Sequence, residues 1–297
     1  MRALITGASG LLGSYLIKTS IGDGVDRVLY TKRFDVLDVG EVYSNFIAFK
    51  PDVVIHCAGE ARVDYAEVNP YEVRFTNIFG LANLLMASAE YKAHFVFISS
   101  NAVYSGERPP YAEDSLRQPI NEYGMTKKNC EDLVFRYPHK LSIVRPILMY
   151  GVPNPGRRGN MVTRAIDDLK THGFTQAVDD VVSQPLSAMD AAIAIWWIIE
   201  IQKTNSLTMN IGSKEPITLY EFVQDIAETW GYGRDKVMPI KSSDLKQFAP
   251  RPRDTSYELS KMEQFGFNPL PVKQGLARMR QEIESKNSAM SDMGLSA

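Results

Sequence analysis

The stretch that decides the fold is Gly7-Ala8-Ser9-Gly10-Leu11-Leu12-Gly13. It directly follows the apolar run 3–6 and leads into a segment of helical spacing that continues through residue 18. Glycines at this spacing, between a first strand and a first helix, permit a tight turn and a close approach of the backbone to a diphosphate. The helix N-terminus adds amide donors and partial positive charge. The stretch therefore predicts a dinucleotide-binding loop, with contacts from Gly7, Ser9, Gly10, Leu11, Leu12 and Gly13.

Short apolar runs alternate with longer segments of helical spacing from residue 1 to about residue 146. Apolar runs without internal alternation are typical of strands buried on both faces. Parallel strands joined by right-handed crossover helices are the economical arrangement for such a series. We therefore predict a doubly wound α/β fold, a Rossmann parallel sheet, with strands over 27–31, 52–57, 94–99 and 141–144 beside the first, and a helical stretch over 73–91.

The regularity loosens after about residue 150, where prolines and glycines mark a loop. We expect helices over 161–170 and 219–230, the second with Thr218 as N-cap, an apolar helix around Trp196 and Trp197, and a strand over 207–211. The expected domains are a dinucleotide-binding domain over 1–150, to which later segments can return, a smaller mixed α/β substrate-binding part over 151–285, and a mobile tail over 286–297.

Composition excludes several classes of protein. The chain has 297 residues, 44% of them hydrophobic, and 33 Lys and Arg against 35 Asp and Glu, for a net charge of -2. This balance is that of an ordinary globular protein. The chain lacks the strong positive charge that would attract nucleic acid or an acidic membrane surface. The longest apolar run, 191–199, is too short to span a bilayer. With no apolar leader at the N-terminus, a cytoplasmic location is expected.

Cysteine and histidine patterns predict no metal. Cys57 and Cys130 are read as reduced thiols. The four histidines show no ligand spacing, so neither a structural nor a catalytic metal is expected. A homodimer is the expectation from base rates alone.

The end of the second strand informs on the cofactor. An NAD site usually carries an acidic residue about 20 positions after the glycines, on the adenosine 2′-hydroxyl. Here the stretch reads Tyr30-Thr31-Lys32-Arg33. A basic pair without an acid suits a 2′-phosphate, so NADP(H) is favoured, with NAD(H) as the alternative. The competing interpretation is that Lys32 and Arg33 belong to a solvated loop.

Three residues have the pattern of a proton-transfer site. Tyr123 and Lys127 lie four positions apart at the start of an expected helix, which places both side chains on one face. An ammonium near the phenol favours its ionised form, which a free tyrosine reaches only near about pH 10. Ser100 closes the fourth predicted strand and could hold a substrate carbonyl while Tyr123 donates the proton.

With these features in place, the sequence resembles the extended short-chain dehydrogenase/reductase family from residue 1 to roughly residue 282. Within it, the chain looks most like the nucleotide-sugar 4-keto reductases of the dTDP-4-dehydrorhamnose reductase type. The stretches that carry this likeness are PDVVIHCAG at 51–59, VDYAE at 63–67, NEYGMTK at 121–127 and RPRD at 251–254.

The resemblance implies roles for individual residues. It makes Ser100, Tyr123 and Lys127 the catalytic triad and places a nucleotide sugar in the C-terminal part. Arg251 matches an arginine that meets the substrate diphosphate in relatives, a role that suits a guanidinium. The further cofactor contacts that it implies are Asp38 and Val39 near the adenine and Cys57, Ala58 and Gly59 on the nicotinamide side, and the substrate candidates are Ser100, Asn101, Tyr104 and Arg251.

The expected function is an NAD(P)-dependent oxidoreductase that reduces the 4-keto group of a nucleotide-activated deoxysugar. Related dehydratases carry an Asp-Glu pair where this chain has Asn101-Ala102, so no acid/base pair is placed for water elimination. The stretch 99–104 is closer to 4-epimerases, which makes an NAD-dependent nucleotide-sugar 4-epimerase the first alternative. A non-catalytic regulatory subunit of the same fold is the second, since the branch also resembles the regulatory subunit of methionine adenosyltransferase.

Overall fold

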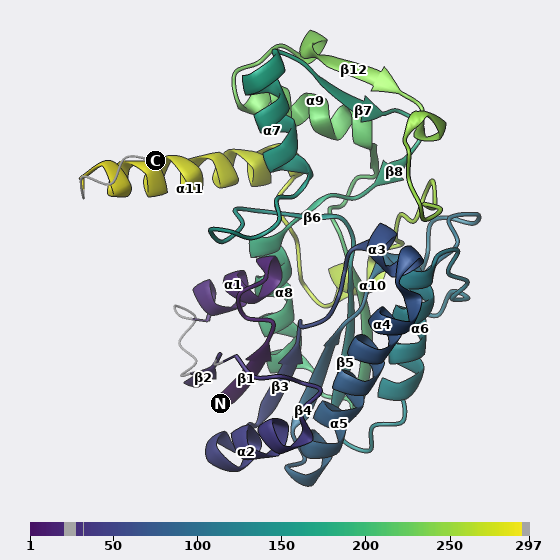
Figure 1. The fold of residues 1–297 in the computed structure, drawn as a ribbon, viewed down its shortest axis with the longest axis vertical. Coiled ribbons are helices and arrows are strands. Elements are labelled where there is room, and N and C mark those ends of the chain that lie inside the picture. The colour runs from purple at the N-terminus through teal and green to yellow at the C-terminus, as the bar shows by residue number, and fades with distance from the viewer. Residues whose placement is uncertain (21–27, 32, 293–297) are drawn as a thin grey trace.

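The computed structural model describes residues 1–20, 28–31 and 33–292 of the chain. Its main sheet has six parallel strands in the order β10-β5-β4-β3-β1-β2 (Figure 1). The predicted doubly wound α/β fold is confirmed. The strands are β1 (Arg2–Thr6), β2 (Val28–Tyr30), β3 (Val53–His56), β4 (His94–Ile98), β5 (Leu141–Pro146) and β10 (Ser206–Ile211).

Helices cover both faces of this sheet (Figure 1). On one face, α1 (Leu11–Lys18) packs against α8 (Ala188–Ile201), and the Trp196 indole of α8 donates to the Leu16 carbonyl at 3.0 Å. The other face is covered by α2 (Val39–Phe49), α5 (Gly80–Glu90) and α6 (Glu122–Val134). Because both faces are buried, every residue of β3, β4 and β5 is buried, which explains their continuous apolar runs.

The expected helix over 73–91 is divided. The structure has α4 (Pro70–Arg74), a π-helical turn η1 (Phe75–Phe79) and then α5. The wider turn adds no composition signal of its own, so helical spacing alone could not locate it. Gly80 follows the turn where a Cβ atom would stand 2.6 Å from the Val36 side chain. The glycine thus lets this helix approach the segment after β2.

The C-terminal part has a core of its own, built around Leu169, Phe222 and Ile226. Its main elements are α7 (Met161–His172), β7 (Thr175–Val178) paired in parallel with β12 (Val237–Ile240), α9 (Leu219–Thr229) and α11 (Val272–Asp292). The expected N-cap of α9 is confirmed: Thr218 accepts from the Glu221 amide, and Glu221 accepts from the Thr218 amide.

The remaining elements are short. They are α3 (Val63–Val68), α10 (Ser260–Gln264), β6 (Met149–Tyr150) with β9 (Leu186–Ser187), β8 (Val182–Ser183) with β11 (Ile217–Thr218), and the 3-10 turns η2 (Asn101–Val103), η3 (Arg234–Lys236) and η4 (Ser242–Asp244). None of the helices within the described ranges has the length and apolar character needed to cross a bilayer.

The chain passes between the two parts more than once. After β6 it builds α7 and β7, and then α8 and β10 return to the main sheet, where β10 pairs with β5. A dividing line at residue 150 therefore stays a prediction, while the return of later segments is a feature of the topology. The mobility of the tail over 286–297 also stays a prediction; its backbone is helical as far as Asp292. Residues 293–297 lie outside the described residues.

Glu282 connects α11 to neighbouring side chains. Glu282 accepts from the Tyr15 hydroxyl at 2.8 Å, which ties the helix to α1. The same carboxylate pairs with Lys18 at 3.1 Å and with Lys286 at 3.3 Å. The second pair is spaced one helical turn apart and supports the helix as it enters the segment 286–292.

Candidate active site

The carboxyl ends of the parallel strands place the candidate site. From β1 the chain runs outward to β2 and then returns to β3 on the other side of β1, so the strand order reverses between β1 and β3. Ligands of open α/β sheets bind at such a switch point. The glycine loop follows β1, and the segment containing Ala58 and Gly59 follows β3, so the predicted cofactor residues meet there.

The glycine loop has the shape that a diphosphate requires. Gly7 has a φ of +67°, and a Cβ atom there would stand 2.6 Å from the Ala58 nitrogen. At Gly13 a Cβ atom would stand 2.3 Å from the Gly7 carbonyl oxygen. Gly10 is the N-cap of α1 and has no side chain to accept from the first-turn amides. The close backbone approach and these amide donors fit the diphosphate of a dinucleotide cofactor.

Thr6, at the end of β1, organises the turn after β3. Its Oγ1 accepts from the Ala58 amide at 3.2 Å and lies 2.7 Å from the His56 Nδ1. Burial lowers the pKa of His56 to about 3, so the imidazole is neutral at physiological pH and can accept the threonine proton at Nδ1. Burial raises the pKa of the Cys57 thiol to about 12. Both side chains are therefore neutral packing groups at the edge of the cofactor region.

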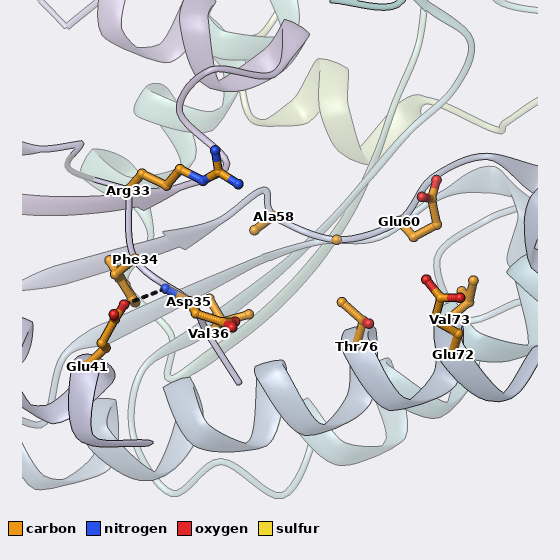
Figure 2. Close-up of a pocket in the computed structure, with 11 residues that line it drawn as sticks. Arg33, Phe34, Asp35, Val36, Glu41, Ala58, Glu60, Glu72, Val73 and Thr76 are labelled. Carbon is orange, nitrogen blue, oxygen red and sulfur yellow. Dashed lines mark hydrogen bonds between the residues drawn. The ribbon is translucent and has the colours of Figure 1, made fainter. Parts of the chain in front are cut away.

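A pocket of about 660 Å³ opens beyond the end of β2 (Figure 2). Arg33 stands on one side of this pocket, opposite the helices, as Figure 2 shows. Figure 2 also shows the hydrogen bond that the Asp35 amide donates to the Glu41 carboxylate, at 2.8 Å. The lining residues are Arg33, Phe34, Asp35, Val36, Glu41, Ala58, Gly59, Glu60, Glu72, Val73 and Thr76.

The pocket lining combines the Arg33 guanidinium with acidic side chains. Its four acids have local partners: Asp35 accepts from a backbone amide, Glu41 from the Asp35 amide, Glu60 from Arg62, and Glu72 from a tyrosine hydroxyl. Arg33 has no ion-pair partner in the described ranges. Lys32, predicted to act with it, lies outside the described residues.

The predicted adenine contacts, Asp38 and Val39, lie beside this pocket in sequence but are not among its lining residues. Asp38 is the N-cap of α2 and accepts from the Glu41 amide at 3.0 Å, and neither it nor Val39 lines the pocket. Asp35 and Val36 line it instead. The signal that could have separated the two aspartates is the capping rule, since an Asp directly before a helical segment is a preferred N-cap.

The three predicted catalytic residues gather at the end of β4. Ser100 caps the turn η2, where its Oγ accepts from the Ala102 amide at 3.1 Å. Tyr123 lies in the first turn of α6, and the Lys127 Nζ stands 5.9 Å from its ring centroid. Lys127 also donates to the Ile98 carbonyl at 2.9 Å. The ammonium thereby joins α6 to β4 beside the phenol ring.

A buried ion pair behind these residues was not predicted from the sequence. Glu131, one helical turn after Lys127, accepts from the Arg145 Nε and Nη2 at 2.8 and 2.7 Å. Ser99, the neighbour of Ser100, donates to the same carboxylate at 2.5 Å. The pair thus fixes α6 against the ends of β4 and β5. The available signal was a charged residue, Arg145, inside an otherwise apolar strand.

Tyr104 is a correction to the substrate candidates. Its side chain is 0% exposed, and the ring stacks on Tyr111 with centroids 4.4 Å apart. Its hydroxyl accepts from Arg145 at 2.5 Å and donates to the Ala112 carbonyl at 3.0 Å. A substrate cannot reach this side chain, because the ring is buried. The hydroxyl instead serves as a hydrogen-bond partner of the buried Arg145 guanidinium.

The remaining substrate candidates meet through the segment 249–255. Asn101 donates its side-chain amide to the Thr255 hydroxyl at 2.6 Å. Arg251 pairs with Asp64 at 2.9 Å through Nη2, and burial lowers the pKa of its guanidinium. The Arg251 Nη1 is buried and finds no hydrogen-bond partner among the described residues. A buried donor without a partner is costly, so this nitrogen fits a bound anion.

Comparison with known proteins finds similar proteins along most of the chain. The family model described as RmlD substrate binding domain matches residues 1–285. Methionine adenosyltransferase 2 subunit beta of Xenopus laevis is 30% identical over 279 residues, which cover 89% of this chain and 82% of that protein.

Two crystal structures are similar along nearly the whole chain. The dTDP-4-dehydrorhamnose reductase of Bacillus anthracis in complex with NADP has a TM-score of 0.86 and 27% identity, and the match covers 95% of this chain and 99% of that one. A dTDP-4-dehydrorhamnose reductase ortholog from Clostridium acetobutylicum has a TM-score of 0.87 and 29% identity, with 96% and 100% covered. The similarity therefore includes both the dinucleotide-binding part and the C-terminal part.

Proposed function

The chain belongs to the RmlD substrate binding domain family, and on that premise we propose that it reduces the 4-keto group of a nucleotide-linked deoxysugar with NADPH. It is an NAD(P)-dependent oxidoreductase of the extended short-chain dehydrogenase/reductase type. The observation that carries the proposal is the gathering of Ser100, Tyr123 and Lys127 at the end of β4, on the same sheet edge as the glycine loop.

The cofactor would be held by three groups of residues. The glycine loop and the first turn of α1 offer their amides to the diphosphate. Arg33, with Lys32, offers charge to the 2′-phosphate that distinguishes NADPH from NADH. Ala58 and Gly59 provide the backbone on the nicotinamide side. When bound, the reduced nicotinamide supplies a hydride to the substrate carbonyl carbon.

The side chains at the end of β4 would handle the proton. The Tyr123 hydroxyl donates its proton to the carbonyl oxygen, which becomes the product hydroxyl. The Lys127 ammonium, 5.9 Å from the ring centroid, stabilises the negative charge left on the phenol oxygen. The Ser100 hydroxyl donates to the same substrate oxygen and orients it; in the structure it donates to the Asn101 side-chain oxygen at 3.2 Å and accepts from the Ala102 amide at 3.1 Å.

The substrate diphosphate would meet Arg251. Its Nη2 is held by Asp64, and its buried Nη1 has an open donor, so a phosphate oxygen would supply the partner that this nitrogen lacks among the described residues. Asn101 occupies the position where related dehydratases carry a carboxylate, and its amide is bonded to Thr255. An amide cannot transfer protons in the way that water elimination requires, which favours simple reduction.

A second candidate is a non-catalytic regulatory subunit, favoured by the 30% identity with methionine adenosyltransferase 2 subunit beta. That protein is a subunit of a transferase, and fold alone does not separate the two functions. The triad of Ser100, Tyr123 and Lys127 argues for chemistry in this chain, because a regulatory surface has no need for a tyrosine and a lysine on one helical face beside a cofactor loop.

The test is the loss of dihydronicotinamide absorbance when purified protein meets NADPH or NADH and a dTDP-4-keto-6-deoxyhexose generated in situ. Rapid loss, faster with NADPH, is the expected result. Interconversion of 4-epimers without net loss of absorbance would replace the reductase by the 4-epimerase. Inactivity with both cofactors and no epimerisation would overturn the enzymatic proposal in favour of the regulatory subunit.

A further inference from the structure

The loop between β6 and α7 reaches from the C-terminal part to the glycine loop. Asn154 donates its side-chain amide to the Ser9 carbonyl at 3.1 Å. Arg157 donates to the Ser9 hydroxyl at 2.5 Å. Ser9 lies within the turn proposed to hold the cofactor diphosphate. A guanidinium from a distant segment thus lies directly on that turn.

This loop is fixed at both ends. The Val152 amide donates to the Tyr15 hydroxyl of α1 at 2.9 Å, and Asn160 caps the start of α7 with a reciprocal bond to its first turn. Between them, the Arg157 amide donates to the Asn154 carbonyl at 3.0 Å and closes a turn. Arg157 is therefore carried to the glycine loop by a defined backbone rather than by a freely moving side chain alone.

Among the residues that the structure describes, Arg157 has no acidic partner. No carboxylate lies within 4.0 Å of its guanidinium in the part of the chain that the structure describes. A guanidinium offers five N–H donors, and the neutral Ser9 hydroxyl accepts one of them. The first-turn amides of α1 are donors as well. A cation placed beside a row of donors favours an anion between them, since charge-assisted bonds are stronger than neutral ones.

We propose that Arg157 is a cofactor-binding residue that donates to the diphosphate of the dinucleotide. The amides of the glycine loop contact the diphosphate from the dinucleotide-binding part, and Arg157 contacts it from the C-terminal part. The inference rests on the proposed function only in its use of a dinucleotide cofactor. It applies to NADPH and NADH alike, because both carry the same diphosphate.

The experiment titrates the purified protein with NADPH and with NADH and follows dihydronicotinamide fluorescence. Arg157→Ala should raise the Kd of both dinucleotides about 10-fold, which is the loss expected for a charge-assisted hydrogen bond. Arg157→Lys keeps the charge but lacks the planar guanidinium, so its Kd for each dinucleotide should lie between those of the wild type and Arg157→Ala. Arg158→Ala is the matched control, because it removes an exposed arginine from the next position and should leave both Kd values unchanged.

A second ligand separates the diphosphate from the 2′-phosphate. Adenosine 2′-monophosphate has no diphosphate, so Arg157→Ala should bind it as the wild type does in calorimetry. Arg33→Ala should show the opposite pattern: weaker binding of NADPH and adenosine 2′-monophosphate, with NADH unaffected. Equal thermal unfolding temperatures of the variants would show that the fold is intact.

Unchanged dinucleotide affinity in Arg157→Ala overturns the inference, as does an equal loss of adenosine 2′-monophosphate binding. A loss of the same size in Arg158→Ala also overturns it, because the effect would then come from surface charge in general. These titrations need no sugar substrate. Absence of keto-sugar reduction would therefore defeat the proposed function while leaving the role of Arg157 to be decided by binding alone.

Discussion

Asn121 joins the helix that carries Tyr123 to the backbone at Pro250, 129 positions later. Its Oδ1 accepts from the Gly124 amide at 2.8 Å and caps α6, while its Nδ2 donates to the Pro250 carbonyl at 2.9 Å. One side chain thereby sets the start of the catalytic helix and the position of the segment that carries Arg251. This residue therefore links the segment of the proposed proton donor to the segment of the proposed substrate arginine.

Asn121→Ser separates the two roles. Serine keeps a capping oxygen but cannot reach Pro250, so we expect the free energy of unfolding to fall by no more than about 1 kcal/mol. The KM for the nucleotide sugar should rise several-fold, because the Arg251 segment loses its tether. The Kd of NADPH should stay the same. Steady-state kinetics and a fluorescence titration measure these quantities, and a change in cofactor affinity equal to that in KM would contradict the prediction.

Glu131→Gln should strongly destabilise the fold. The substitution leaves the Arg145 guanidinium, 1% exposed, without a negative partner, which costs about 3–5 kcal/mol. Asp132→Asn is the control, because Asp132 is the adjacent acid but is 41% exposed in its pairs with Arg117 and Lys128. Its loss should cost less than about 1 kcal/mol. Urea unfolding of both variants decides; similar costs would show that the buried pair is not the support that we infer.

Stability should fall as the pH drops below about 6.5, where a histidine in an unfolded chain takes up a proton. Burial lowers the pKa values of His56 and His94 to about 3, so the folded protein does not bind those protons until much lower pH. Each histidine should therefore cost about 1.4 kcal/mol of stability per pH unit between about pH 6.5 and pH 3, with its full contribution present above 6.5.

His94→Gln tests this pH dependence. Glutamine can still hydrogen-bond to Ser142, the partner of His94 at 2.8 Å, but does not titrate. Between pH 6.5 and pH 5 the variant should lose about 2 kcal/mol less than the wild type. The measurement is the urea unfolding free energy at several pH values, each protein referred to its own value at pH 7.5. Parallel curves for the two proteins would contradict the prediction.

Tyr123→Phe should nearly abolish turnover, because it removes the proposed proton donor and little else. The loss expected for general acid catalysis is about 10²–10⁴-fold in kcat. The ring remains to pack against Ala66 and Val73, so the fold and the Kd of NADPH should not change. Single-turnover absorbance measurements with saturating cofactor give the rate. A variant with wild-type kcat would require another proton donor.

The sheet could be read from the sequence because its strands are buried on both faces. Such strands are continuous apolar runs, and β3, β4 and β5 each fall within a predicted run or overlap it. The glycine loop could also be predicted, from the spacing of its glycines. The structure explains why glycine stands there, since a Cβ atom at Gly7 or Gly13 would collide with backbone. The π-helical turn η1 was missed because one widened turn does not alter the residue pattern.

Residues of the candidate site could be predicted where local spacing in the sequence indicates their position. Tyr123 and Lys127 share a helical face, and Ser100 follows a strand, so local spacing suffices to place them. The burial of single side chains could not be predicted from the sequence. Tyr104 lies next to the site in sequence, yet its hydroxyl is the partner of a buried arginine. Asp35 and Asp38 differ in role only because α2 begins after the second of them.

The sequence by itself determined the class of fold, and it placed the glycine loop and the candidate residues Ser100, Tyr123 and Lys127, since each depends on residues within a few turns or on the burial of a whole strand. The tertiary structure alone decided which distant residues meet. Arg145 finds Glu131, Asn121 finds Pro250, and Arg157 finds Ser9 only because the order of strands brings their elements together. Such contacts depend on packing in three dimensions, and no local periodicity records them.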